Sequence, residues 1–168
     1  MNYFLGLGTV AEIKAKFRDL AFQHHPDLGG DTAMMQQIND QYHKALQGAN
    51  GQQSKGSDGK HHTYRYDEAT EQAIAQKLDE LLSLQLEDID ISIIGTWIWV
   101  TGNTKPCKAQ LKETGLKWHN TRQAWYFNTT GYRGYSSNAD LEELAKTYGV
   151  RNVDNLKKRG KNLQTAIG

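Results

Sequence analysis

The sequence predicts an α+β protein, with a helical hairpin at the N-terminus and a small α+β domain with an antiparallel sheet towards the C-terminus. Apolar residues recur at helical spacing in residues 9–24 and 32–47, as on helices that bury one face. They alternate at strand spacing in residues 89–101 and 116–128, as in half-buried strands. Residues 48–63 lie between these patterns, have no apolar period and are rich in Gly, Ser and Gln, which is typical of a flexible linker.

Local signals predict the ends of the two N-terminal helices. Thr9 precedes the first helix, and Glu12 lies three residues after Thr9. This is the spacing of a capping box. Pro26 ends this helix, because the residue before a proline is disfavoured in the α region. The second helix begins at Asp31 or Thr32 and ends at Gly48. We expect the two helices to pack as an antiparallel hairpin through the apolar stripes Val10, Ile13, Phe17, Leu20, Ala21 and His24, and Met35, Ile38, Tyr42 and Ala45 or Leu46.

Residues 67–148 predict strands and three further helices. In residues 89–101, Gly95-Thr96 divides two strands, with Trp97 and Trp99 on one side and Ile98 and Val100 on the other. Residues 116–128 predict a hairpin that turns at residues 120–123. The expected helices cover residues 67–86, a short segment capped by Thr104 with Pro106 in its first turn and Gly115 at its end, and residues 138–148.

The charge distribution indicates a two-part protein joined by a connector. The net charge of the chain is +1, but residues 89–168 contain 12 Lys/Arg and 6 Asp/Glu, whereas residues 51–88 contain 4 and 8. Such asymmetry suggests separate parts. The expected division is a hairpin domain at 1–48, a flexible linker at 49–66, a connecting helix at 67–88, a Trp-rich α+β domain at 89–150 and a basic tail at 151–168.

Composition favours a cytoplasmic protein. Cys107 is the single cysteine, so an intrachain disulfide framework is excluded and a reducing compartment is favoured. The N-terminal sequence shows no basic leader followed by a sustained apolar run. No stretch approaches the roughly 18 apolar residues that a membrane span needs.

The stretch AFQHHPDLGGD, residues 21–31, carries the clearest candidate site. His25 and Asp27 could act as a base and its orienting carboxylate, but no Ser or Cys nucleophile accompanies them. His24, His25 and Asp27 could ligate a metal ion, but no fourth ligand has a suitable spacing, and no cofactor is expected. A third interpretation is a helix-ending loop with a solvated histidine.

The surroundings of His25-Pro26-Asp27 resemble the J-domain family of co-chaperones. The stretch IKAKFRDLAFQHHPD looks like the second helix and signature loop of that family, and GGDTAMMQQINDQYHKAL looks like its third helix. Leu5-Gly6-Leu7 is similar to the Leu-Gly opening of the family. The resemblance covers residues 3–47. Departures are Asp19 and Gln23, where the family commonly has basic residues, a much shortened first helix, and no zinc-binding cysteines or Gly/Phe-rich segment.

The resemblance implies a partner and a set of site residues. J-domains bind DnaK-type heat-shock-70 chaperones and stimulate their ATPase, so the catalytic site would belong to the partner and this chain would not be an enzyme. By the same resemblance, His25, Pro26 and Asp27 form the stimulating loop, and Lys14 and Arg18 form a basic face that meets the chaperone. A loop stiffened by proline loses little entropy on docking, and cations steer it towards an acidic surface.

The second half suggests how a client or target is chosen. All four tryptophans lie in residues 89–168 among basic residues, a combination that binds single-stranded nucleic acid but also fills the core of a small sheet. The segment loosely resembles a small Trp-rich module of phage and plasmid proteins. The alternative function is therefore a nucleic-acid-binding accessory protein that uses the hairpin for docking. Its expected surface for nucleic acid or a client comprises Trp97, Lys105, Lys108, Lys112, Trp118, Arg122 and Tyr126, with Trp99 and Trp125 expected in the core.

An enzyme built on His119 or Cys107 is the third reading. No complete set of nucleophile and base accompanies either residue. A histidine in a hairpin turn and a cysteine in the first turn of a helix are more often structural.

Overall fold

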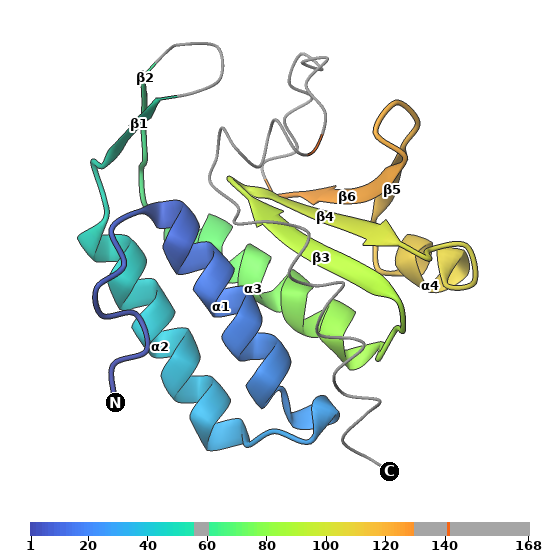
Figure 1. Cartoon of the computed structure of the whole chain (residues 1–168), viewed down its shortest axis with the longest axis horizontal. Coiled ribbons are helices and arrows are strands. Elements are labelled where there is room, and N and C mark those ends of the chain that lie inside the picture. The colour runs from blue at the N-terminus through green and yellow to red at the C-terminus, as the bar shows by residue number, and fades with distance from the viewer. Residues whose placement is uncertain (56–60, 130–140, 142–168) are drawn as a thin grey trace.

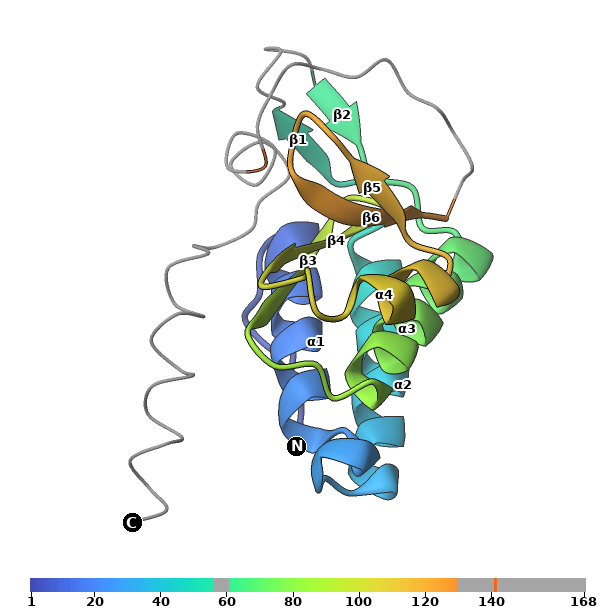
Figure 2. The same cartoon turned by 90° about the vertical axis from the view of Figure 1, so that its right-hand side faces the viewer.

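The fold is mixed α and β, as the sequence predicts. In the computed structural model, which describes residues 1–55, 61–129 and 141, four α-helices accompany two antiparallel sheets. Figures 1 and 2 show α1 and α2 side by side, with α3 and the larger sheet packed next to them. The expected helix at 138–148 and the basic tail at 151–168 lie outside the described residues, apart from Leu141.

The two N-terminal helices form as their end signals predict. Helix α1 spans Val10–His24, and Thr9 and Glu12 make both hydrogen bonds of the capping box. Helix α2 spans Thr32–Gly48 and is capped by the Asp31 carboxylate, which accepts from the Met34 N–H. The short 3-10 helix η1, Pro26–Leu28, connects them. Phe17 and Tyr42 stack with ring centroids 3.9 Å apart, so the predicted stripes do face each other.

The segment expected to be a flexible linker contains paired strands. Strands β1 (Gln53–Lys55) and β2 (His61–Thr63) form an antiparallel ladder. Flanking hydrogen bonds extend the pairing, from Gly51 N–H to the Tyr64 carbonyl and from Tyr64 N–H to the Gln52 carbonyl. The expectation of a linker throughout 49–66 is therefore corrected. Backbone pairing outweighs the weak strand propensity of this polar sequence.

Helix α3 and the larger sheet complete the fold. Helix α3 spans Glu68–Ser83. The sheet has the order β3-β4-β6-β5, with all neighbours antiparallel. Its strands are β3 (Ile89–Ile94), β4 (Trp97–Gly102), β5 (Lys117–His119) and β6 (Ala124–Asn128). Helix α4, Lys108–Glu113, begins later than the Thr104 cap predicts, and Cys107 takes the N-cap position.

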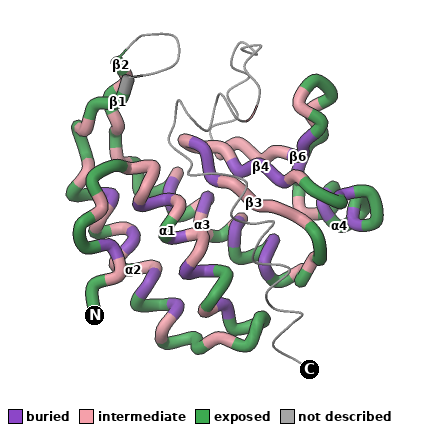
Figure 3. Tube along the Cα trace, viewed as in Figure 1, coloured by how far each residue is buried: buried purple, intermediate pink, exposed green. Residues whose placement is uncertain are grey.

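One hydrophobic core joins the two halves of the chain. It includes Phe17 of α1, Tyr42 of α2, Leu78 of α3, Val100 of β4 and Leu111 of α4. Figure 3 shows the buried positions on the facing sides of these elements. The helical hairpin and the sheet are therefore packed together, which corrects the expectation of two parts separated by a flexible linker.

Candidate functional site

The His-Pro-Asp loop lies at the end of the α1–α2 hairpin, where α1 stops. Pro26, Asp27 and Leu28 are exposed, whereas His25 is 2% exposed. The backbone closes on itself, because the N–H groups of Leu28 and Gly30 both donate to the His25 carbonyl, at 3.0 and 2.9 Å. The predicted loop residues therefore share one site, with two of them at the surface and the histidine beneath.

The His25 imidazole has a partner on each nitrogen. Nδ1 accepts from the Asp27 N–H at 3.2 Å, and Nε2 lies 2.8 Å from Oδ1 of Asp79 on α3. The Asp27 carbonyl accepts from the Gln85 side-chain amide, just beyond the end of α3. No local sequence pattern links Asp79 or Gln85 to this loop. A helical period shows which side of α3 is polar but not which distant loop that side meets.

The expected basic face of α1 is corrected by the structure. Lys14 is 2% exposed, and its Nζ bonds Glu71 Oε1 at 2.9 Å and the Gly95 carbonyl at 2.7 Å. Arg18 pairs with the neighbouring Asp19 at 2.7 Å and contacts the Ile91 carbonyl at 3.4 Å. These cations face α3 and β3, because the hairpin carries a second covered side that an apolar stripe alone does not reveal.

Glu71 accepts hydrogen bonds from the side chains of Lys14, Tyr42 and Tyr64, and we call these four residues the Glu71 network. Its Oε1 accepts from Lys14 and from the Tyr64 hydroxyl at 2.9 Å, and its Oε2 accepts from the Tyr42 hydroxyl at 3.0 Å. Burial lowers the pKa of Lys14, an effect that Glu71 opposes. Burial, followed by the charge of Glu71, raises the pKa values of Tyr42 and Tyr64. Such a satisfied network fixes how the helices and the sheet meet.

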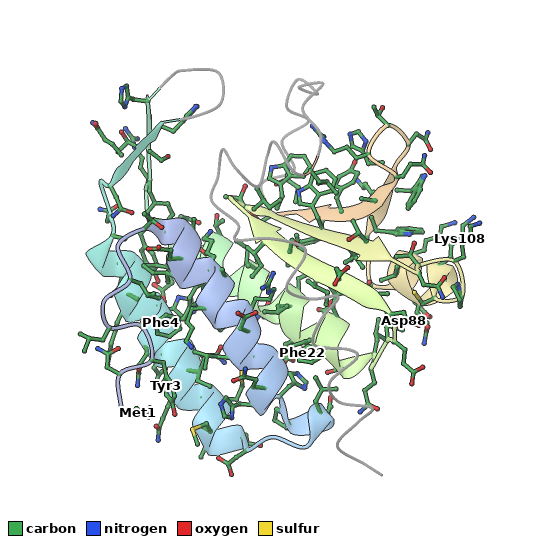
Figure 4. All side chains as sticks on the ribbon, viewed as in Figure 1. Met1, Tyr3, Phe4, Phe22, Asp88 and Lys108 are labelled. Atoms are coloured by element: carbon green, nitrogen blue, oxygen red, sulfur yellow. The ribbon has the colours of Figure 1, made fainter. Side chains whose placement is uncertain are left out.

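An exposed apolar side chain lies close in sequence to the loop. Phe22 of α1 is 59% exposed and Leu28 of η1 is 37% exposed. Figure 4 shows Phe22 near the C-terminal end of α1. Exposed apolar side chains therefore lie beside the exposed Asp27 at this end of the hairpin.

The seven residues expected to bind nucleic acid or a client do not form one surface. Trp97 and Tyr126 pack against a small cluster of sheet residues that is separate from the core shared with the helices, and Arg122 lies over Trp99 of that cluster. Trp118 lies on the other side of the sheet, opposite Trp125 in register and 5.6 Å from its ring. The exposed lysines Lys105, Lys108 and Lys112 lie on α4 or in the turn before it, and Lys108 extends outward there (Figure 4).

The outer face of the sheet carries an aromatic cluster, which we define as Trp97, Trp99 and Tyr126. Trp97 and Trp99 stack at 5.7 Å, and each lies within 5.6 Å of the Tyr126 ring. Arg122 lies over Trp99, with its Cζ 5.3 Å from the ring centroid. As expected, Trp99 is buried, at 3% exposure, and Trp125 is buried on the inner face. Leu141 also packs against the cluster.

His119 and Cys107 each have a contact with a residue close in sequence. His119 lies beside Arg122, and burial followed by this charge lowers the pKa of its imidazole. Cys107 is buried, and its thiol donates to the Thr104 carbonyl. Across residues 1–55, 61–129 and 141, no three His, Cys, Asp or Glu side chains gather as metal ligands, and no helix has the length and hydrophobicity to cross a membrane.

Comparison with protein-family models, curated proteins and solved structures finds no match for this chain.

Proposed function

We propose that this protein is a co-chaperone that binds a DnaK-type heat-shock-70 chaperone and stimulates its ATPase through the His-Pro-Asp loop. The observation that carries the proposal is the loop itself. Pro26 and Asp27 are exposed at the end of a packed helical hairpin, while His25 is fixed beneath them on both ring nitrogens. The resemblance of residues 3–47 to J-domains names the class of partner.

The geometry suits docking on another protein. An exposed loop that is already ordered loses little conformational entropy when it binds. The Asp27 carboxylate is at the surface and can meet a cation of the partner in a charge-assisted contact. Because Lys14 is buried and Arg18 is paired with Asp19, attraction between these two cations and an acidic surface contributes little. The contact is therefore centred on the loop.

The test is single-turnover ATP hydrolysis by a bacterial DnaK-type chaperone with increasing amounts of this protein. Asp27→Asn removes a surface charge from the loop and should abolish most of the stimulation while the fold survives. Asp40→Asn removes a surface charge from α2 away from the loop and serves as the matched control. Stimulation that survives Asp27→Asn unchanged would contradict the proposal.

A second function is favoured by the aromatic cluster. Stacked rings on a sheet face with a cation at the edge hold the bases and backbone of single-stranded nucleic acid in other folds. Trp97 and Tyr126 are partly exposed, Arg122 lies over Trp99, and Lys117 is exposed opposite Tyr126. In this proposal the sheet selects a nucleic-acid target and the loop recruits the chaperone.

Fluorescence anisotropy with a labelled thymidine oligonucleotide tests the second function. Binding should weaken as salt rises, and Trp97→Ala should weaken it about ten-fold through lost stacking. Trp118→Ala is the control, because this tryptophan is 40% exposed on the opposite face. Equal losses in both variants, or no binding at low salt, would reject the aromatic cluster as the binding surface.

A further inference from the structure

Asp79 contacts the buried histidine of the loop from outside the segment that resembles a J-domain. Its Oδ1 is 2.8 Å from His25 Nε2, across 54 positions of sequence. The His25 side chain is 3% exposed, whereas the Asp79 side chain is 62% exposed. The carboxylate therefore remains largely hydrated while it holds a buried ring, so the contact does not require a buried charge on α3.

The two contacts of the imidazole select one neutral tautomer. The Asp27 N–H donates to Nδ1, so Nδ1 is an acceptor and carries no proton in this arrangement. Nε2 then carries the proton and donates it in a hydrogen bond to the Asp79 carboxylate. A partner on one ring nitrogen commonly fixes which nitrogen is protonated and how the ring is turned.

The α3 region holds the loop at a second point. The Gln85 amide donates to the Asp27 carbonyl, so the backbone and the histidine of the loop are both tied to α3 and its C-terminal end. The exposed faces of Pro26 and Asp27 are left available for a partner. The loop conformation therefore depends on a helix outside the hairpin.

We infer that Asp79 is a positioning residue for His25, and that it keeps the His-Pro-Asp loop in the conformation that engages the chaperone. This inference rests on the proposed co-chaperone function. Asp79 touches neither ATP nor the reacting atoms, and it acts through the imidazole. Without it, the ring and the loop must be ordered during docking, which raises the cost of association.

The experiment is a titration of single-turnover ATP hydrolysis by a bacterial DnaK-type chaperone with four forms of the full chain. They are the unaltered protein, Asp79→Ala, Asp79→Asn and Glu80→Ala. Because the Asp79 carboxylate is largely hydrated, we expect the loss of an ordinary hydrogen bond, so that Asp79→Ala raises the concentration for half-maximal stimulation about five-fold. The maximal rate should stay close to that of the unaltered protein. Asp79→Asn keeps an acceptor oxygen and should restore most of the loss.

Glu80→Ala is the matched control, because it removes a half-exposed carboxylate of the same helix whose ion-pair partner is Lys77. Circular dichroism checks that all forms are folded. Side-chain ¹⁵N chemical shifts of His25 provide the readout that a general loss of stability would not move. The Nε2–H tautomer should dominate in the unaltered protein and in Asp79→Asn, and the two tautomers should mix in Asp79→Ala.

Two results would overturn the inference and are distinguishable. Equal titration curves and equal nitrogen shifts for the unaltered protein and Asp79→Ala would show that Asp79 does not position His25, with the co-chaperone function intact. No stimulation by the unaltered protein would reject the proposed function, and with it the role of Asp79 in that function.

Discussion

Lys14 and Glu71 form a buried ion pair that joins α1 to α3, with 2.9 Å between Nζ and Oε1 and side-chain exposures of 3% and 2%. The Glu71 carboxylate also accepts hydrogen bonds from the Tyr42 and Tyr64 hydroxyls. Lys14 Nζ also donates to the Gly95 carbonyl. A lysine in the segment that resembles a chaperone-binding helix thus has an internal partner, and it contributes to how the hairpin and the sheet are held together.

Removing one member of the Lys14–Glu71 pair should lower the free energy of unfolding strongly. Lys14→Met leaves the Glu71 carboxylate buried without its cation, and we expect a loss of about 3–5 kcal/mol in the free energy of unfolding. Urea denaturation followed by tryptophan fluorescence measures this loss. Lys16→Met on the same helix, where the lysine is exposed, is the control and should change stability by less than about 0.5 kcal/mol. A small loss for both variants would show that the pair is not buried in solution.

The Glu71 network predicts that the folded protein loses stability in alkaline solution. The pKa of Tyr64 is raised in the folded protein, so above pH about 10 the unfolded chain releases a proton that the folded chain retains. Stability from this group is complete below pH 10 and falls as the pH rises beyond it. The lowered pKa of Lys14 acts in the opposite direction.

Tyr64→Phe should therefore make the fall in stability above pH 10 less steep. The measurement is the free energy of unfolding from urea curves between pH 8 and pH about 11. Tyr3→Phe is the control, because the Tyr3 hydroxyl contacts a methionine sulfur instead of a carboxylate. Parallel pH profiles for the unaltered protein and Tyr64→Phe would contradict the contact with Glu71.

The elements of the fold follow from local signals, whereas the site depends on contacts between distant residues. The Thr9 cap, Pro26 and the alternation of Trp97 to Val100 predict α1, its end and β4 correctly, because each acts within a few residues. The ion pair of Lys14 spans 57 positions. A cation on the polar side of a helix looks solvated until a second element is known to cover that side.

The same distinction explains why the sequence predicts the face of Trp97 and Trp99 correctly but not the face of Trp118. Alternation places Trp97 and Trp99 on one face, and the sheet confirms this. It does not show that Trp118, on the edge strand β5, points to the opposite face, because that depends on its register with Trp125. Sequence proximity groups the lysines of α4 with the tryptophans, and the fold separates them.

Gly30 should tolerate no side chain. A Cβ at this position would lie 2.1 Å from the carbonyl carbon of His24, so Gly30→Ala must displace the loop backbone. We expect a destabilisation of about 1–3 kcal/mol and a loss of chaperone stimulation. Gly48→Ala is the control, since nothing lies within 4 Å of its Cβ and alanine favours a helix. Thermal unfolding compares the two, and equal melting temperatures would contradict the close approach.

His119 should titrate below its ordinary value of 6.5, because burial and then Arg122 disfavour its cation. An unfolded chain then binds a proton that the folded chain does not, so this group removes stability as the pH falls through about 6.5. Arg122→Gln should raise the pKa of His119. Proton NMR of the imidazole ring follows the titration, and an unchanged or lowered midpoint in the variant would contradict the proximity of the two groups.

The central claim is that the His-Pro-Asp loop acts on a DnaK-type chaperone. The most direct measurement is the single-turnover rate of ATP hydrolysis by such a chaperone with the unaltered protein, His25→Gln and His24→Gln, each first shown to be folded. We predict stimulation by the unaltered protein and by His24→Gln, whose histidine is only partly buried, and loss of stimulation with His25→Gln. Equal rates with and without the unaltered protein, using chaperones from several bacteria, would contradict the claim.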